Sequence, residues 1–435
     1  MPAGGPDTVT VPGVVAGWAA LADFGARLDL ARILAPAIEL ARGGVAVSSG
    51  LARATRARLD VVRADPGLSA LVLDARAEPL PEGTLICQPA LARTLTTVAA
   101  DWRSFYSGEL AGRLVDALVG FGSSLSRSDF ADHRAESPPP LQLSVDGVTW
   151  SAAPPPSQGA AFLAVLDSAA LGLDLGASVL DPGQRVAAVL AAAHSAELRR
   201  DVLLGDPRSG PIDVAALLGS ADGSARPSVH TLPTGPKPAG DTVAVTVVAD
   251  DGSAVSLIQS VFQSFGSGLL DPDTGVVFHN RGSAFSLDPT HPGRVRPGAR
   301  PPHTLCPVLG VGRNTVLALG CQGGRAQPWI LSQVAGDAID VPNLTALLAR
   351  PRWVIGSREL GRSRPTLMLE PGTPEADVLI SSARAFGMEV VETLGFHDDA
   401  GHVQVARFGP GGLDAASDPR ADGESIVVPT PGGSS

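Results

Sequence analysis

The stretch from Gly240 to Ser260, GDTVAVTVVADDGSAVSLIQS, decides the fold. It contains two runs rich in valine and other apolar residues, at 243–249 and 254–260, on either side of the turn-forming triplet 250–252. Two such runs joined by an Asp-Gly turn are typical of an antiparallel β-hairpin. The sequence therefore predicts a hairpin here and a mixed α and β fold after it.

The register of this predicted hairpin places two hydroxyl groups together. With a three-residue loop, Ala249 pairs with Ser253, and the same count along both strands places Thr242 opposite Ser260. Directly paired side chains lie about 4.5–5.5 Å apart at Cβ. Such a pair is either ordinary Thr–Ser pairing in a sheet or part of a reactive site, and the register alone leaves both interpretations open.

The segments around the hairpin differ in character. Residues 225–240, ARPSVHTLPTGPKPAG, contain four prolines and few apolar residues, which predicts an extended linker into the hairpin. Before the linker, helical spacing of apolar residues predicts helices within 12–42, 50–74, 90–120 and 159–205. Asp181 followed by Pro182 marks the start of the clearest helix. After the hairpin, short apolar runs predict strands at 275–278, 308–311, 315–319 and 390–394.

The composition is that of a packed globular protein and limits its partners. Of the 435 residues, 44% are hydrophobic and 18% are charged, a balance that excludes a disordered chain. The formal net charge of −11 argues against nucleic acid or an anionic membrane as a partner, because both attract basic faces.

No cofactor, metal or targeting signal is expected. The three cysteines, Cys87, Cys306 and Cys321, form neither a C-x-x-C pair nor a Cys/His cluster, so neither a disulfide framework nor a zinc site is indicated. The G-x-S-x-G elbow, the P-loop, the dinucleotide fingerprint and the H-E-x-x-H motif do not occur. The chain starts without a signal peptide, and its apolar runs are shorter than a bilayer span, so we expect a cytoplasmic protein.

The hairpin also resembles a known catalytic element. Thr242 opens its first strand, and DGSAV follows at 251–255, as in the nucleophile hairpin of gamma-glutamyltranspeptidases. Nine further segments are similar to that family and occur in its order: VTVPGVVAGW (9–18), LAPAIELARGG (34–44), FYSGELAGRLV (105–115), PPPSQG (154–159), FGSGLLDPDTG (265–275), HNRGSAFSL (279–287), RPPHTLCP (300–307), CQGG (321–324) and ASDPRADG (416–423). The chain is therefore identified as a member of the gamma-glutamyltranspeptidase family of N-terminal-nucleophile hydrolases.

The resemblance implies a fold and a division of the chain. The expected fold is an α+β four-layer αββα sandwich, with two antiparallel sheets packed face to face and helices outside. Precursors of this family cleave themselves before a threonine, here between Asp241 and Thr242. Residues 1–241 would then form a large-subunit-like region and residues 242–435 a small-subunit-like region, held together as a heterodimer.

The same resemblance assigns catalytic roles. The α-amino group freed on Thr242 acts as the base for the threonine hydroxyl, because a terminal amine has a pKa of about 7.7–8.0. The hydroxyl attacks an amide carbonyl, and the acyl-enzyme passes its acyl group to water or to an acceptor amine. Ser260 matches the second hydroxyl, which orients the nucleophile. Gly323 and Gly324 match the glycine pair whose N–H groups stabilise the oxyanion.

The substrate-binding positions depart from the family pattern. Ala284 stands where typical members carry an acidic residue for the donor's α-amino group, and His303 and Thr304 replace the serines that hold the donor's carboxylate. Arg281 offers a carboxylate a bidentate partner if it points inward; otherwise it is a surface or loop-anchoring arginine. The pattern favours an acyl group with a carboxylate and without an amine, as in the glutaryl-type acylases of the family.

A further departure concerns the beginning of the sequence. Typical members have a substantial segment before the VTVPG motif, with a core strand, a helix and a donor-binding arginine, whereas this sequence starts almost at that motif. We expect either a start assigned too far downstream or a shortened homologue.

The expected function is that of a self-cleaving amidohydrolase or acyltransferase. Its substrates would be gamma-glutamyl amides such as glutathione, or related glutaryl-type amides. The alternative is an inactive homologue that acts at most as a binding protein.

Overall fold

The structure, a computed structural model, describes residues 1–174, 181–219 and 240–428. The chain forms two compact units. Unit 1 consists of Met1–Pro138 and Ser260–Ala284, and unit 2 consists of Pro139–Gln259 and Phe285–Ser435. The predicted linker lies outside the described residues up to position 239. The predicted division into residues 1–241 and 242–435 refers to cleavage of the chain. The two compact units do not report on cleavage, so this division stays a prediction.

Unit 1 is built mainly from short helices. These are α1 (Val14–Ala20), α2 (Leu30–Gly43), α3 (Ser49–Ala57), α4 (Leu59–Ala64), α5 (Pro66–Val72), α6 (Pro89–Ala100), α7 (Ser104–Ser107), α8 (Glu109–Gly120) and α9 (Arg127–Ala131). Two small strand pairs join them: β1 (Val45–Ala46) with β2 (Leu85–Ile86), and β7 (Leu270–Asp271) with β8 (Val276–Val277).

Helix α2 shows how the sequence sets these elements. The Asp29 side chain accepts a hydrogen bond from the Arg32 N–H and starts the helix, and Gly44 ends it. Leu34, Ile38 and Ala41 are its buried residues, at the i, i+4 and i+7 spacing of one helical face. The two helices expected within 12–42 are therefore confirmed.

The expected helical stretch 50–74 is instead divided into three helices. Helix α3 ends at Ala57, with Arg58 as its C-cap. Helix α5 begins at Pro66, and its N-cap Asp65 accepts a hydrogen bond from the Leu68 N–H through its side chain. Proline cannot donate a backbone hydrogen bond to a preceding turn, so Pro66 starts a helix more readily than it continues one. The stretch 90–120 is divided in the same way into α6, α7 and α8.

Unit 2 contains a six-stranded antiparallel sheet. Its strand order is β15-β14-β10-β9-β4-β3. The strands are β3 (Leu141–Val145), β4 (Val148–Ala152), β9 (Val308–Val311), β10 (Val316–Gln322), β14 (His402–Gly409) and β15 (Gly412–Ser417). Strands β9 and β10 confirm the strands expected at 308–311 and 315–319. Strands β3 and β4 lie in the part of the chain for which only helices were expected.

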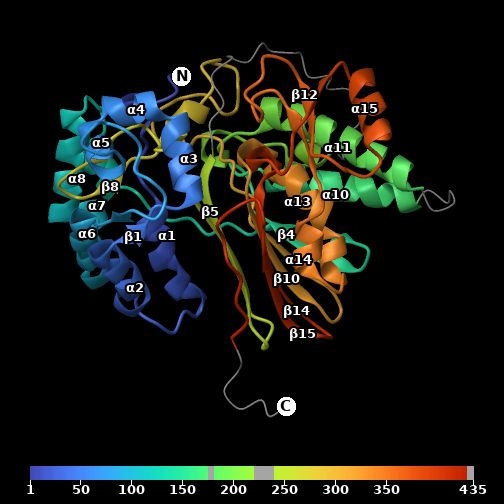
Figure 1. Ribbon diagram of the computed structural model, residues 1–435, viewed down its shortest axis with the longest axis horizontal. Helices are drawn as coiled ribbons and strands as arrows, with labels where there is room; N and C mark the ends of the chain where they lie inside the picture. Colours follow the sequence, from blue (N-terminus) through green and yellow to red (C-terminus); the bar gives the residue numbers. More distant parts are fainter. Residues whose placement is uncertain (175–180, 220–239, 429–435) are drawn as a thin grey trace. The chain divides into compact units, whose positions relative to one another are not determined.

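Helices cover one face of this sheet. Alternate residues of β10, Leu317, Leu319 and Cys321, belong to the same buried core as Phe162 of α10 (Gly159–Asp174) and Trp329 of α13 (Gln327–Ala335). Helix α11 (Pro182–Leu203) packs beside α10 (Figure 1). It begins as expected at Asp181, where a reciprocal capping box with Gln184 satisfies the first turn.

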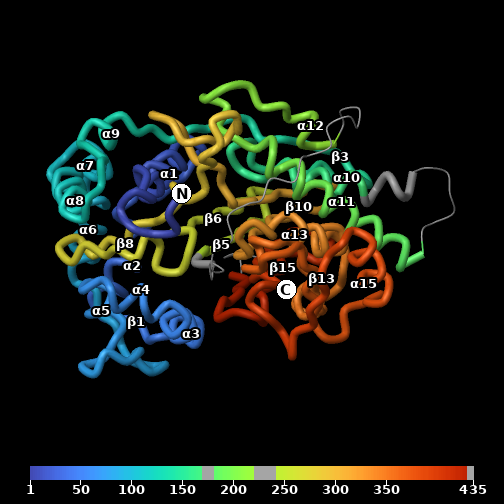
Figure 2. The backbone as a smooth tube through the Cα atoms, turned by 90° about the horizontal axis from the view of Figure 1, so that it is seen from above, coloured from blue at the N-terminus to red at the C-terminus, as the bar shows by residue number. Residues whose placement is uncertain are grey.

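The predicted hairpin packs on the opposite face. It consists of β5 (Gly240–Val248) and β6 (Ala254–Gln263), and the Ala249 N–H donates to the Ser253 carbonyl at 2.8 Å. A Cβ placed on Gly320 of β10 would lie 3.0 Å from the Ala244 Cβ, so the hairpin and the sheet are in direct contact (Figures 1 and 2). The pairing of Ala249 with Ser253 is confirmed, whereas that of Thr242 with Ser260 stays a prediction.

A smaller sheet completes unit 2. Strand β12 (Thr366–Leu369) lies between β11 (Trp353–Gly356) and the parallel strand β13 (Glu389–Glu392), which confirms a strand expected near 390–394. Helix α14 (Leu344–Leu348) packs against β15, and α15 (Ala376–Ala385) packs against β12 and β13, whereas α12 (Val214–Leu218) packs on α10 and α11.

Replacement of Gly310 tests the packing of the large sheet. Gly310 pairs with Trp150 across β9 and β4, and an added Cβ would lie 2.8 Å from the indole ring. Trp150 is 2% exposed, so its ring cannot move out of the way. We expect Gly310→Ala to lower the free energy of unfolding by about 1–3 kcal/mol, measured as a lower urea midpoint.

Gly411→Ala is the matched control, because nothing lies within 4 Å of an added Cβ there. It should leave the urea midpoint unchanged or raise it slightly, since alanine restricts the unfolded chain. Equal midpoints for both variants would contradict the predicted strain at Trp150.

Candidate active site

The predicted site residues are distributed over both units. Unit 2 contains Thr242, His303, Thr304, Gly323 and Gly324, and unit 1 contains Ser260 and Arg281. Asp241 and Thr242 lie in β5, near its beginning.

In unit 2, three segments that are distant in sequence meet at Gln158. The Gln158 Nε2 donates to the Thr304 carbonyl at 2.5 Å and to the Gly324 carbonyl at 2.9 Å. The His303 N–H donates to the Pro156 carbonyl at 2.7 Å. The structure therefore brings the PPPSQG, RPPHTLCP and CQGG segments together.

The turn after β10 requires both of its glycines. A Cβ on Gly323 would lie 2.8 Å from the Ile330 Cδ1, and Gly324 has a φ of +52°, a left-handed conformation that suits glycine. The Gly323 carbonyl accepts from the Ala326 N–H at 2.9 Å. Because C=O and N–H of a trans peptide point in opposite directions, the Gly324 N–H points away from this hydrogen bond. Such an outward N–H is suited to bind an anion.

Thr242 belongs to the strand that packs on β10. Two residues after it, Ala244 lies over Gly320, and β10 leads directly from Gly320 to the turn at Gly323. The Ser256 hydroxyl of the same hairpin donates to the Leu319 carbonyl at 2.6 Å. Hairpin and glycine turn are thus attached to one sheet-on-sheet contact.

A buried network of ion pairs lies beside the turn. Arg200 of α11 donates through Nη2 to Glu359 Oε1 at 2.7 Å and through Nη1 to the Arg325 carbonyl at 2.6 Å. Arg325 donates through Nε to the same Glu359 oxygen at 2.9 Å, and its Nη2 pairs with Asp201. The backbone just after Gly324 is therefore held by charged groups with several partners each.

Glu197 is a titratable member of this region. Burial raises the pKa of Glu197 to about 7, and repulsion by the nearby Glu359 adds to the effect. His194 lies one helical turn earlier, with its Nδ1 3.6 Å from the Glu197 carboxylate. Glu197 therefore changes charge close to neutral pH.

In unit 1, Ser260 and Arg281 both contact Phe262. The Ser260 hydroxyl oxygen accepts from the Phe262 N–H at 2.8 Å, and the Arg281 guanidinium carbon lies 3.8 Å from the centre of the Phe262 ring. Phe262 has a φ of +80°, which is strained for a residue with a side chain. These two contacts hold the strained residue in place.

Arg281 is a buried cation. It is 4% exposed, so Arg281 is not a surface arginine, and its role as a carboxylate partner or as a loop anchor stays a prediction. Burial lowers the pKa of Arg281 to about 9, which leaves it charged at neutral pH. Burial, together with the charge of Arg281, lowers the pKa of the adjacent His279 to about 4, so this imidazole is neutral. Ala284 ends the same short helix, η4 (Arg281–Ala284).

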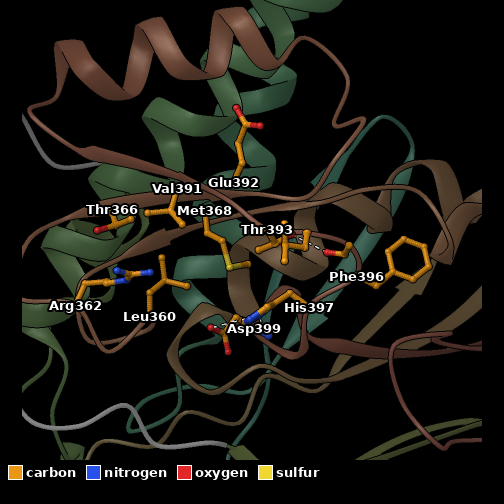
Figure 3. A pocket seen from close by; sticks show the side chains of 12 residues that line it. Leu360, Arg362, Thr366, Met368, Val391, Glu392, Thr393, Phe396, His397 and Asp399 are labelled. Atoms are coloured by element: carbon orange, nitrogen blue, oxygen red, sulfur yellow. Dashed lines mark hydrogen bonds and ion pairs between the residues drawn. The ribbon is translucent and has the colours of Figure 1, made fainter.

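A separate pocket of about 370 Å³ lies on unit 2, at the smaller sheet (Figure 3). Its walls include Leu360, Met368 and Val391, with Arg362 at one side and His397 beside Asp399. Glu392 points away from it. The pocket lining includes none of the predicted site residues, so it does not form part of the candidate site.

Comparison with known proteins decides the family. The family model described as gamma-glutamyltranspeptidase matches residues 1–428. The chain belongs to this family. It is 38% identical to the oxamate amidohydrolase proenzyme of Klebsiella pneumoniae, over 95% of this chain and 80% of that protein. It is 32% identical to a glutathione hydrolase-like proenzyme of Bacillus subtilis, over 97% of this chain and 81% of that protein.

A solved structure agrees with this assignment. The crystal structure of a cephalosporin acylase from Bacillus halodurans superposes with a TM-score of 0.82 at 29% identity, over 98% of this chain and 79% of that chain. The fold is therefore that of the N-terminal-nucleophile hydrolases, with mixed helix and sheet. In the part of the chain that the structure describes, no helix is long and apolar enough to span a membrane.

Family membership confirms the expected class of enzyme. The chain is a gamma-glutamyltranspeptidase-like or acylase-type amidohydrolase, and the name proenzyme, shared by several relatives, indicates autoprocessing in this family.

Sequence reasoning missed three residues of the candidate site. Gln158 lies in a quoted family segment but had no assigned role, and Arg200 and Glu359 were not singled out. All three are polar or charged and buried. Their signal in the sequence is weak, because a buried polar residue shows its importance only through partners that the sequence does not reveal.

Glu197→Gln tests the buried titratable group. The pKa in the folded protein lies above the ordinary value of 4.5, so the folded state holds more protons between about pH 4.5 and 7. Stability contributed by this group is complete at low pH and is lost as the pH rises through 7. We expect the urea midpoint of Glu197→Gln, relative to the parent, to rise from pH 5 to pH 8.

Glu109→Gln is the control, since the Glu109 side chain is 89% exposed. Its urea midpoint relative to the parent should not depend on pH in this way. A pH-independent difference for Glu197→Gln would show that Glu197 is ionised throughout.

Proposed function

We propose that the chain is a self-cleaving amidohydrolase for small amides whose acyl group carries a carboxylate and no α-ammonium group. Oxamate and glutaryl amides have this chemistry, whereas gamma-glutamyl amides carry the extra ammonium. The proposal includes the four-layer αββα sandwich of the family and a heterodimer of residues 1–241 and 242–435.

The meeting of three segments at Gln158 carries this proposal. A single side-chain nitrogen binds the carbonyls of Thr304 and Gly324, so the proposed carboxylate-binding segment and the proposed oxyanion turn are neighbours. We propose that a substrate with a carboxylate a few bonds from its amide carbonyl spans these two segments. The similarity to an oxamate amidohydrolase proenzyme supports the same class of substrate.

The proposed reaction begins with cleavage of the Asp241–Thr242 peptide bond. The freed amine of Thr242 accepts the proton of the threonine hydroxyl, and the oxygen attacks the amide carbonyl. The N–H groups of Gly323 and Gly324 donate to the resulting oxyanion, and Ser260 orients the nucleophile. The leaving amine takes the proton as the C–N bond breaks. Water then attacks the threonine ester, which releases the acid and restores the hydroxyl.

The donor pocket would use charge to select its substrate. Arg281 is a buried cation, and His303 and Thr304 each carry a hydrogen-bond donor, so each of the three side chains is suited by its chemistry to a carboxylate. Ala284 offers no partner to an ammonium group, and a buried ammonium without an acidic partner costs several kcal/mol. A gamma-glutamyl donor would therefore bind less favourably than a glutaryl donor, because its ammonium group would be buried without an acidic partner.

An inactive binding protein remains the second candidate function. The departures at Ala284, His303 and Thr304 favour it, because they alter positions that bind the donor in typical members. Maturation separates the two candidates, because only the enzyme needs a free amine on Thr242.

The first experiment tests maturation. We expect the purified chain to appear as two fragments, 1–241 and 242–435, with threonine at the new N-terminus. Denaturing electrophoresis with N-terminal sequencing measures this. Thr242→Ala should remain a single chain without activity, because it lacks the attacking hydroxyl.

Thr246→Ala is the matched control, because Thr246 lies four residues after Thr242 in β5 and therefore on the same face of the strand. It should cleave like the parent. A parent chain that persists uncleaved, or that breaks elsewhere, would favour the binding protein.

The second experiment tests donor choice. We compare kcat/KM for a glutaryl anilide, an oxalyl anilide (oxanilate) and a gamma-glutamyl anilide with one leaving group, since this ratio isolates the donor pocket. The glutaryl compound should be hydrolysed at least as well as the gamma-glutamyl compound. Ala284→Asp should shift the preference toward the gamma-glutamyl compound.

Ala284→Asn serves as the neutral control of similar size and should not produce this shift. If the parent prefers the gamma-glutamyl anilide by about tenfold or more, another acidic residue binds the amine, and the proposed role of Ala284 is wrong.

A further inference from the structure

Gln158 is fixed in place by its own backbone. It is 1% exposed and lies just before α10, which begins at Gly159. A Cβ on Gly159 would lie 2.2 Å from the Ala153 carbonyl oxygen, so the chain passes very close to the end of β4 at this point. The Gln158 side chain therefore starts from a rigid loop.

The surroundings of Gln158 require an amide. Its Nε2 faces two backbone carbonyls, those of Thr304 and Gly324, and its Oε1 accepts from Arg200 Nη1 at 3.1 Å. Carbonyls can only accept and a guanidinium can only donate, so the partners themselves fix which end of the amide is oxygen. A carboxylate at this position would keep the bond to Arg200 and lose both bonds to the carbonyls.

Arg200 connects Gln158 to a rigid base. Its guanidinium lies over the Trp329 ring, with 5.0 Å from its carbon to the ring centre. It is 3% exposed and binds Glu359 and the Arg325 carbonyl as well as Gln158. One arginine thus supports the Gly324 carbonyl through Gln158 and the Arg325 carbonyl directly.

We infer that Gln158 is a positioning residue that sets the oxyanion turn and the carboxylate-binding segment in one common geometry. This inference rests on the proposed function for its effect on catalysis. Gly324 has no side chain and a left-handed backbone. Its carbonyl accepts from the Gln327 N–H of the same turn and from the Gln158 Nε2, so Gln158 is the partner that ties the turn to a segment distant in sequence. Through Thr304, the same nitrogen fixes the segment expected to bind the carboxylate.

The test compares two substitutions with different losses. Gln158→Glu keeps the acceptor for Arg200 and loses both donations, whereas Gln158→Met keeps the volume and loses all three bonds. A residue that only fills space and satisfies Arg200 would tolerate glutamate. The positioning role predicts that both variants lose kcat/KM for the preferred anilide, on the order of 10²-fold, with a lower kcat and a higher KM.

Hydrogen exchange supplies a readout that does not depend on activity. The N–H groups of His303, Cys306 and Ala326 are hydrogen-bonded next to the two segments that Gln158 links. In Gln158→Glu we expect faster exchange in peptides covering 303–306 and 323–327 and unchanged exchange in β14 and β15. Gln142→Glu, the same substitution on an exposed residue of β3, should change neither segment.

The outcomes separate this inference from the proposed function. Faster exchange in both segments of Gln158→Glu supports the positioning role of Gln158. A parent that hydrolyses none of the anilides refutes the proposed function and leaves this support unchanged. Unchanged exchange in both segments overturns the inference. An active parent whose Gln158→Glu variant keeps its kcat and KM also overturns it.

Discussion

The contact between the β5–β6 hairpin and β10 is the constraint on which the site depends. Gly320 allows this contact, because a larger residue would meet Ala244 at the centre of the interface. Thr242 lies two residues before Ala244 in the hairpin, and Gly323 follows three residues after Gly320 at the end of β10. The position of the proposed nucleophile is therefore a property of sheet packing more than of any loop.

The sequence predicted the elements that have local signals. The hairpin turn, the capping box at Asp181 and the ends of α2 each depend on residues within a few positions of one another. Strands β3 and β4 were missed, although β3 alternates apolar and polar residues over five positions. These two strands form a second Asp-Gly hairpin, in which Val145 pairs with Val148 across Asp146-Gly147, so their turn carried a local signal that went unused. Only the pairing of β4 with β9 joins segments that are far apart in the chain. The four-layer αββα arrangement expected from the family stays a prediction.

The candidate site was predictable as a set of segments and not as a network. Family resemblance identified Thr242, Gly323 and Gly324 because they lie in recognisable motifs. It did not identify the function of Gln158, whose partner Gly324 is 166 positions away. Hydrogen-bond partners at such separations cannot be derived from spacing, since they depend on how the sheet and helices pack. The burial of Arg281 was likewise left open by the sequence, and its contact with Phe262 depends on a strained backbone that no motif announces.

The hydrogen bonds around Gln158 have a consequence for a chain broken before Thr242. Gln158 and Arg200 precede the break, whereas Thr304, Gly324 and Glu359 follow it. Cleavage would turn these bonds from links within one polypeptide into bonds between two, so that the turn in the second fragment would receive its side-chain support only from the first fragment. Loss of the covalent connection would then be compensated by buried polar contacts that a mismatched fragment could not reproduce. The hydrogen bonds of Gln158 and Arg200 would thus contribute both to the association of the two fragments and to the geometry of the glycine turn.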